Sequence, residues 1–330
     1  MKRRAFIGFA GWIMTNWPLA LLAQQSDIKK RIGVLIARPE NDAEGQSYRA
    51  AFQQALDLLG WRPGHNVEID YRWTAGNADL ADTFARELIA LRPDILLINS
   101  TASVIAARRI AGTIPIVMAA VADPVAQGFV QSLERPGSNI TGFAVEEPEM
   151  GAKWVELLKE ISPRVRHITA VYNPDSAPFA RMFLPSIESV RASFSVELAI
   201  ALVRNEDDVG NAIAAAARQQ DGGLLFLPDS FLASRRDLIA NLVAKQRLPA
   251  IYSHPSFVRN GGLIGYGFDR ADIFRRAASY VDRILKGEKP SQLPVQMPTK
   301  FELAINLKAA QALELTIPPA LLARADEVVE

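Results

Sequence analysis

A segment near residue 100 alternates short apolar runs with polar turns, and this pattern constrains the fold more than any other feature. Residues 94–98 start with Asp94 and continue as an apolar run without alternation, which is typical of a strand buried on both faces of a parallel sheet. The run stops at residues 99–101, where a helix is expected to begin. A second apolar run, residues 114–120, is followed by a turn that contains Asp123. Because open α/β sheets bind ligands beyond the carboxyl ends of their strands, both turns are candidate pocket loops.

The same order of elements returns in the second half of the chain. Residues 224–227 read as an apolar strand, and it ends on a Pro-Asp-Ser turn at residues 228–230. A helix follows, and then a second strand over residues 250–252 that ends on Ser253. Two such units in similar surroundings indicate two similarly built lobes. Chance likeness between two βαβ units is the alternative.

The other elements follow the order of a doubly wound α/β protein. Hydrophobic periodicity predicts strands at residues 29–36, 66–73, 140–145, 165–172, 196–202, 261–268 and 301–306. It predicts helices at residues 44–59, 79–91, 128–133, 151–161, 179–194, 207–219, 269–286 and from 318 onward. A kink is expected near Pro185, because proline cannot donate a hydrogen bond to the preceding helical turn.

The N-terminal 23 residues read as a secretory signal peptide. They have a basic start, an apolar middle and a small residue, Ala23, before polar residues. Arg3 and Arg4 fit a twin-arginine signal and an ordinary basic start equally well. A permanent membrane anchor is the alternative, although Pro18 and its polar neighbours interrupt the apolar run. We therefore expect an exported chain.

Composition and missing motifs exclude several classes of function. The chain has no cysteine, which removes thiol catalysis, disulfides and a lipoprotein anchor. The net charge of +1 gives no case for nucleic-acid binding. The sequence has no P-loop, no dinucleotide fingerprint, no nucleophile elbow and no H-E-x-x-H motif. We expect no catalytic residues, no metal site and no cofactor.

Two groups of titratable residues have a structural and a functional interpretation. The three histidines, His65, His167 and His254, lie far apart, and only His254 follows a predicted strand end closely enough to reach a ligand. The acidic residues Glu146, Glu147 and Glu149 precede a predicted helix. There they complement the helix dipole, and this reading is favoured over catalysis.

The chain resembles a family of exported binding proteins. The resemblance lies in the N-terminal export signal, KRIGVLI, RPDILLINSTASVIAARR, the segment AVADPV, the segment RPGSNITG and the tail IPPALLARADEVVE. These segments are similar to bacterial periplasmic substrate-binding proteins of ABC transporters, in the group related to tryptophan-binding and tyrosine-binding members. The resemblance covers about residue 30 to residue 330.

This resemblance implies a type I periplasmic-binding fold: α/β, with two doubly wound parallel-sheet lobes joined by a three-segment hinge. The N-terminal lobe would comprise residues 30–144 plus 269–296, and the C-terminal lobe residues 146–267 plus 299–330. A ligand cleft would lie between them. Hinge closure around a small solute is the expected mechanism.

The resemblance also implies a function and partners. A monomeric periplasmic protein would deliver a small solute to an ABC permease in the inner membrane. An aromatic or branched amino acid is an extrapolation from the related members. Two other functions stay open, namely a ligand-sensing module for a membrane receptor and an enzyme on a two-lobed α/β fold.

Strand-end residues are the candidate ligand contacts under this resemblance. Hydroxyls and helix N–H groups would bind a ligand carboxylate, carboxylates a ligand ammonium, and tyrosines would stack or donate hydrogen bonds. The candidates are Asn99, Ser100, Thr101, Asp123, Asn173, Asp229, Tyr252, Ser253 and Tyr266. Each has an alternative role. Ser100, Asp123 and Asp229 could cap helices, and the tyrosines could be packing residues.

Overall fold

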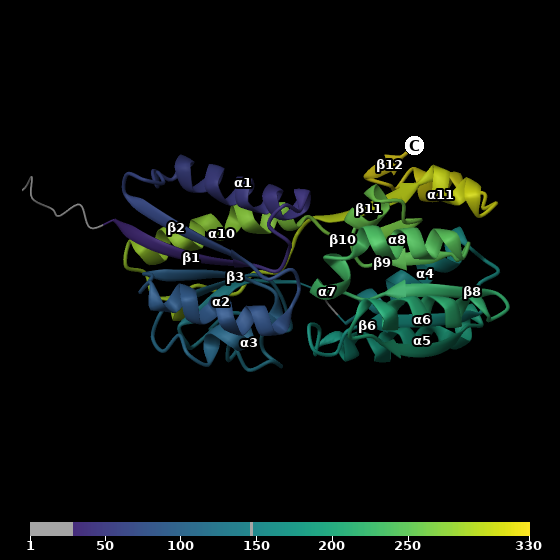
Figure 1. The fold of residues 1–330 in the computed structure, drawn as a ribbon, viewed down its shortest axis with the longest axis horizontal. Coiled ribbons are helices and arrows are strands. Elements are labelled where there is room, and N and C mark those ends of the chain that lie inside the picture. Colours follow the sequence, from purple (N-terminus) through teal and green to yellow (C-terminus); the bar gives the residue numbers. More distant parts are fainter. Residues whose placement is uncertain (1–28, 146–147) are drawn as a thin grey trace, which may run out of the picture.

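The computed structural model describes residues 29–145 and 148–330, which form two α/β lobes side by side (Figure 1). The first lobe contains a parallel five-stranded sheet with the order β2-β1-β3-β4-β5. Its strands are β1 (Lys30–Ile36), β2 (Val67–Trp73), β3 (Ile95–Asn99), β4 (Ile116–Ala122) and β5 (Ile140–Val145). The sheet is therefore doubly wound, with the switch in strand order next to β1.

Helices cover both faces of this sheet. α1 (Ala43–Leu58) and α10 (Arg270–Leu285) pack together on one face, while α2 (Ala78–Ala90) and α3 (Thr101–Arg108) pack on the other (Figure 1). Tyr48 of α1 stacks on Phe274 of α10 with ring centroids 4.8 Å apart. A helix that comes more than 200 residues after β1 in the sequence thus completes the first lobe.

The second lobe contains a seven-stranded sheet with the order β12-β11-β10-β9-β8-β6-β7. All neighbours are parallel except β10 and β11. The strands are β6 (His167–Tyr172), β7 (Glu197–Leu202), β8 (Gly222–Phe226), β9 (Ala250–Tyr252), β10 (Ile264–Phe268), β11 (Phe301–Asn306) and β12 (Glu327–Val329).

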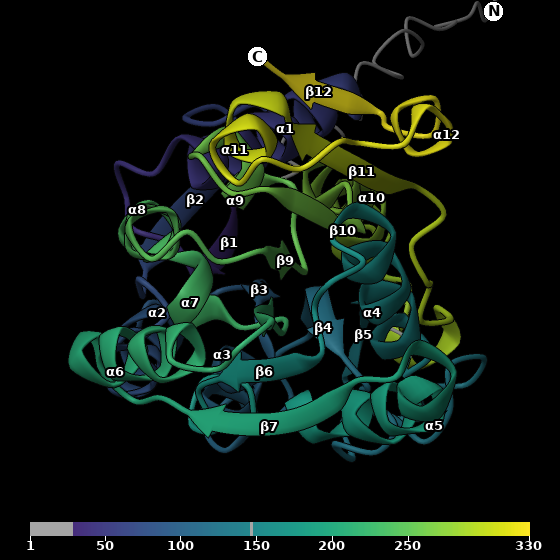
Figure 2. The same cartoon turned by 90° about the vertical axis from the view of Figure 1, so that its right-hand side faces the viewer.

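The helices of the second lobe also lie on both faces of its sheet. Figure 2 shows α4 (Met150–Ile161) and α5 (Leu184–Phe194) on one side, and α6 (Glu206–Ala217) and α8 (Arg236–Lys245) on the other. The shorter elements are η1 (Ala180–Phe183), α7 (Ser230–Ala233), α9 (Ser256–Arg259), η2 (Pro290–Gln292), α11 (Leu307–Ala312) and α12 (Pro319–Leu322).

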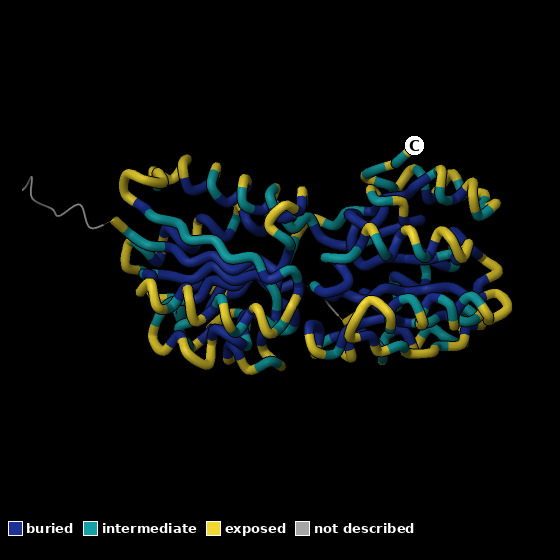
Figure 3. Tube along the Cα trace, viewed as in Figure 1, coloured by how far each residue is buried: buried dark blue, intermediate teal, exposed yellow. Residues whose placement is uncertain are grey.

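The chain passes between the lobes after β5, between β10 and α10, and between η2 and β11. The last crossing runs along β5: Gln296 N donates to Gly142 O at 2.9 Å, and Ala144 N donates to Gln296 O at 2.9 Å. Buried residues follow the inner strands of both sheets, and exposed residues lie on the outer helix faces and on the edge strand β7 (Figure 3). The predicted two-lobed α/β fold with a three-segment hinge is confirmed.

Several local predictions were wrong. Residues 128–133 form turns and no helix, because Phe129 and Val130 both donate to Pro124 O instead of forming a helical ladder. No kink forms within a single helix at Pro185: the segment divides into η1 and α5, and the proline lies in the first turn of α5, where its missing N–H costs nothing. The strand predicted from residue 261 begins at Ile264, and β12 was not predicted.

Two predictions lie outside the described residues, namely the signal peptide at residues 1–23 and the acidic residues Glu146 and Glu147. Within the described part of the chain, no helix has the length and apolarity needed to cross a membrane.

Candidate functional site

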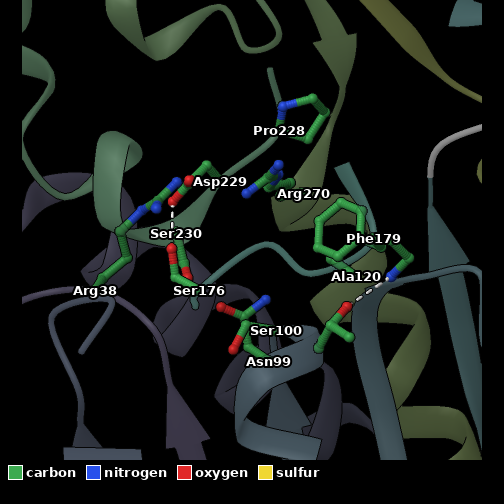
Figure 4. A pocket seen from close by; sticks show the side chains of 12 residues that line it. Arg38, Asn99, Ser100, Ala120, Ser176, Phe179, Pro228, Asp229, Ser230 and Arg270 are labelled. Carbon is green, nitrogen blue, oxygen red and sulfur yellow. Dashed lines mark hydrogen bonds between the residues drawn. The ribbon is translucent and has the colours of Figure 1, made fainter. Parts of the chain in front are cut away.

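A pocket lies where the carboxyl ends of strands from the two lobes face each other (Figure 4). It contains about 370 Å³ of space free of protein atoms, and part of this space is open to solvent. The first lobe contributes Arg38, Asn99, Ser100, Thr101, Ala120, Ala122 and Arg270. The second lobe contributes Ser176, Phe179, Pro228, Asp229 and Ser230. This position is the one expected for a ligand site in an α/β protein.

The N-terminus of α3 forms one wall of the pocket. Ser100 is the N-cap residue, and its hydroxyl accepts a hydrogen bond from Ser103 N at 3.3 Å. Thr101 Oγ1 accepts from Ala122 N at 3.2 Å, which fixes the end of β4 against α3. Free N–H groups and the helix dipole make this wall favourable for an anionic group.

Asn99 holds three strand ends together beneath this wall. Its Oδ1 accepts from Ala37 N at 3.3 Å, and its Nδ2 donates to Ala119 O at 2.9 Å. Both functional groups of the amide are therefore occupied by backbone partners. Asn99 shapes the pocket by joining the ends of β1, β3 and β4.

The backbone of the first lobe is strained beside the pocket. Ser100 and Ala120, which both line it, have φ values of 84° and 62°, and Asp123 has a φ of 40°. The register of β4 against β5 also shifts between Ala119 and Val121. Left-handed conformations of non-glycine residues cost about 1–2 kcal/mol each and are concentrated at functional sites.

Asp229 forms the opposite wall. Its Oδ1 accepts from Ser176 Oγ at 2.7 Å, from Phe231 N at 2.7 Å and from Leu232 N at 3.2 Å. Burial raises the pKa of this carboxyl group, and the hydrogen bonds oppose the shift. The residue is therefore both the N-cap of α7 and a wall of the pocket. Oδ2 accepts one bond, from Asn173 N at 2.5 Å, and so keeps acceptor capacity.

Arginine side chains give the pocket positive charge. Arg38 is buried, and its Nη2 and Nε lie 3.0 Å and 3.2 Å from Glu44 Oε2. Although burial opposes ionisation of both side chains, each charge stabilises the other, so the pKa of Glu44 lies well below its usual range. Arg270, in the first turn of α10, lines the pocket from the opposite side (Figure 4).

Of the nine predicted contacts, the structure places Asn99, Ser100, Thr101 and Asp229 in the pocket. Sequence reasoning missed the following lining residues: Arg38, Ala120, Ala122, Ser176, Phe179, Pro228, Ser230 and Arg270. Arg38 and Ser230 follow strand ends, so the rule that selected Asp229 could have found them. Phe179 lies in an irregular segment between β6 and η1 and carries no such signal.

The other five predicted residues do not line this pocket. Tyr252 is buried in an aromatic stack with Phe226 and Phe257, at centroid distances of 5.1 Å and 4.7 Å. Tyr266 stacks on Phe301. Their side chains point into sheet faces because alternate strand residues face opposite sides. As ligand contacts, both stay predictions.

Asp123, Asn173 and Ser253 also lie outside the lining. Asp123 Oδ1 accepts from Ala126 N at 3.1 Å, and Asn173 Oδ1 accepts from Asp175 N at 2.8 Å. Both side chains therefore organise the loops next to the pocket. Ser253 is buried after β9, next to His254.

Comparison with known proteins gives three kinds of similarity. A family model described as "ABC transporter substrate binding protein" matches residues 34–329. A tyrosine-binding protein of Clostridioides difficile is 25% identical over 293 residues, which are 88% of this chain and 84% of that protein.

Two solved structures share the fold. A conserved domain protein from Vibrio cholerae has a TM-score of 0.82 at 31% identity, with 91% of this chain and 99% of that chain covered. An ABC domain from Streptococcus pneumonia in complex with L-Trp has a TM-score of 0.82 at 24% identity, with 91% and 100% covered.

Proposed function

The chain belongs to the family of ABC transporter substrate-binding proteins, and from this premise we propose that its interlobe pocket captures an amino acid with an aromatic or branched side chain. Solute capture for ABC transport is the function of the family. The amino-acid class is supported by the names of the similar proteins, one tyrosine-binding and one a complex with L-Trp.

One observation carries the proposal: a helix N-terminus and a buried carboxylate face the same pocket from different lobes. The carboxylate of an amino acid would bind at Ser100 and the N-terminus of α3, where positive potential favours it. The ammonium would bind at Asp229 Oδ2. Phe179 would pack against the side chain of the solute.

We propose the following organisation around this pocket. The lobes divide into residues 30–144 plus 269–296 and residues 146–267 plus 299–330, with the pocket in the cleft between them. Hinge closure would bury the solute. The mature protein would be a periplasmic monomer that delivers the solute to an ABC permease in the inner membrane.

Capture would involve no chemical conversion. The lining residues of the pocket include no histidine, cysteine or tyrosine, and Asp229 already accepts four hydrogen bonds. Covalent catalysis pairs a nucleophile with an activated base, and the lining offers no histidine, cysteine or lysine for either role.

Thermal unfolding against a panel of amino acids tests the ligand class. L-Tyrosine or L-tryptophan at ~100 times the dissociation constant is expected to stabilise the folded state by about 2.7 kcal/mol, a rise of several degrees in Tm. Sugars, purines and small dicarboxylates are the controls. If no amino acid shifts Tm, the amino-acid class is wrong, and native mass spectrometry of the purified protein would then identify the bound solute.

Two matched aspartate variants test the pocket contact. Asp229→Asn removes the charge that would bind the ammonium, so calorimetry is expected to give an affinity at least about tenfold lower, as for loss of a charge-assisted bond. Asp123→Asn is the control, because Asp123 lies outside the lining and only caps a turn. Equal affinities for the two variants would refute the role of Asp229.

A further inference from the structure

Two buried polar contacts join the lobes outside the pocket. Asp42 precedes α1 in the first lobe and Arg236 begins α8 in the second, and Asp42 Oδ2 lies 2.5 Å from Arg236 Nη2. Glu44 Oε1 lies 3.1 Å from His254 Nδ1. None of these four side chains lines the pocket. They therefore respond to the position of the lobes, and they do not contact a solute bound there.

Each partner of the first pair is held in place by its own lobe. Asp42 Oδ1 accepts from Gly45 N at 2.8 Å as the N-cap of α1. Arg236 Nη1 donates to Ala233 O at 3.2 Å. Neither side chain has to be reorganised when the lobes meet, so little conformational entropy is lost in forming the pair.

The pair is buried in this arrangement of the lobes. The Arg236 side chain is 10% exposed and that of Asp42 is 6% exposed. Two residues from different lobes can be this close and this buried only when the lobes are closed on each other. Opening would return both charges to water. Closing without Arg236 would leave the Asp42 charge buried and unpaired, and closing without Asp42 would leave Arg236 with only the longer contact to Asp237 at 3.8 Å; both are unfavourable.

We propose that Asp42 and Arg236 form a closure latch, an interlobe ion pair that sets the equilibrium between open and closed lobes and so tunes solute affinity without contacting the solute. The inference rests on the proposed function, because it assumes that the lobes close when the solute binds. The apparent dissociation constant equals the intrinsic one divided by the fraction of closed protein. A weaker latch therefore weakens capture by the factor by which it lowers the closed fraction.

The test needs a measure of closure that involves no solute. Asp79 and Asp207 are exposed, and they line one outer groove from α2 and α6, in different lobes. Because the chain has no cysteine, Asp79→Cys and Asp207→Cys give two unique attachment points. The rate at which a short bis-maleimide joins them reports how often the lobes close, even where closed molecules are a minority.

Three variants are compared in this background: Arg236→Met, Asp42→Asn and the double variant. Asp42→Asn keeps a side-chain oxygen as the N-cap acceptor of α1 and is therefore expected to fold. It tests the ion pair even if Arg236→Met does not fold. Arg247→Met is the matched control, because Arg247 pairs with Glu314 at 3.0 Å within the second lobe and at its surface.

Each single variant is expected to slow cross-linking about tenfold, because one buried charge loses its partner. The double variant is expected to recover most of the rate, and Arg247→Met to leave it unchanged. Equal rates in all proteins, or a double variant slower than both singles, would overturn the latch. A lack of binding of L-tyrosine and L-tryptophan would overturn the proposed ligand class and leave this result unaffected.

Discussion

At the scale of single residues, His254 faces a carboxylate of the other lobe from a buried position. Burial lowers the pKa of its ring to about 3, Glu44 opposes this shift, and Arg270, Arg38 and Arg259 add to it. The ring is therefore neutral at pH 7. Its Nδ1 lies 3.1 Å from Glu44 Oε1 and accepts a hydrogen bond from Ser256 N at 3.2 Å.

This lowered pKa predicts a loss of stability in mild acid. An unfolded histidine titrates near pH 6.5, so between pH 6.5 and 3 the unfolded chain binds a proton that the folded chain does not. The contribution of His254 to the free energy of unfolding then falls as the pH falls, by about 2 kcal/mol between pH 7.5 and 5, while the raised pKa of Asp229 acts in the opposite direction. Glu44, whose pKa is also lowered, contributes only below about pH 4.5, the usual value for glutamate.

Urea unfolding at pH 7.5, 6.5 and 5 measures this slope. His254→Asn removes the titrating ring and is expected to remove most of the pH dependence in this window, whatever its effect on stability at pH 7.5. His167→Asn is the control, because His167 is a partly exposed residue at the start of β6. A slope that persists in the His254 variant would contradict the assignment.

The pocket residues differ in how far the sequence could predict them. Ser100 and Asp229 each follow an apolar run and precede a helix. A helix N-terminus directly after a strand end was therefore enough to predict both as pocket residues. Tyr252 also ends a strand, but its side chain faces the aromatic stack within the second lobe. Which face a strand-end side chain takes depends on register, and register depends on contacts distant in sequence.

At the scale of elements, the turn between β2 and α2 packs directly on the second lobe. Gly76 lies in this turn with a φ of 72°, and a Cβ atom added there would lie 2.4 Å from Ser230 O. Ser230 opens α7 and lines the pocket. The closed lobes therefore need a residue without a side chain at position 76.

Gly76→Ala is expected to hinder closure more than folding. The methyl group costs about 1 kcal/mol in the left-handed backbone conformation, and it also meets the Ser230 carbonyl when the lobes close. We expect cross-linking between the cysteines at 79 and 207 to slow at least about tenfold. Gly64→Ala is the control, because Gly64 has a φ of 82° and no atom within 4 Å of the added Cβ. Similar rates for both variants would refute the steric role of Gly76.

The elements themselves were mostly predictable from periodicity, and the failures share one cause. Helix α10 and strand β7 carry clear periods of 3.6 and 2, and they lie within two residues of the predicted bounds. Strand β12 is three residues long and pairs with β11, and β11 runs antiparallel to β10. Short segments and strand direction depend on partners elsewhere in the chain, and local periodicity carries no information about them.

At the scale of the whole molecule, one apolar core passes from lobe to lobe. The same cluster of buried side chains contains Phe143 and Val145 of β5, Phe268 of β10, Phe274 of α10 and Trp154 of α4. The cluster is thus continuous between the two sheets at the crossings after β5 and before α10. Loss of packing in one lobe therefore exposes apolar surface that the other lobe helps to bury.

This shared core predicts that the lobes unfold together. In differential scanning calorimetry we expect one transition whose calorimetric and van't Hoff enthalpies agree, although two-lobed proteins often deviate from two-state unfolding. Phe274→Ala, which removes the ring stacked on Tyr48 in the first lobe, is expected to cost about 3–5 kcal/mol and to move the whole transition to lower temperature. If the lobes were independent, the variant would instead split the transition, leaving a second-lobe component at the original Tm. A single shifted transition would mean that the hinge transmits stability between the lobes as well as allowing them to move.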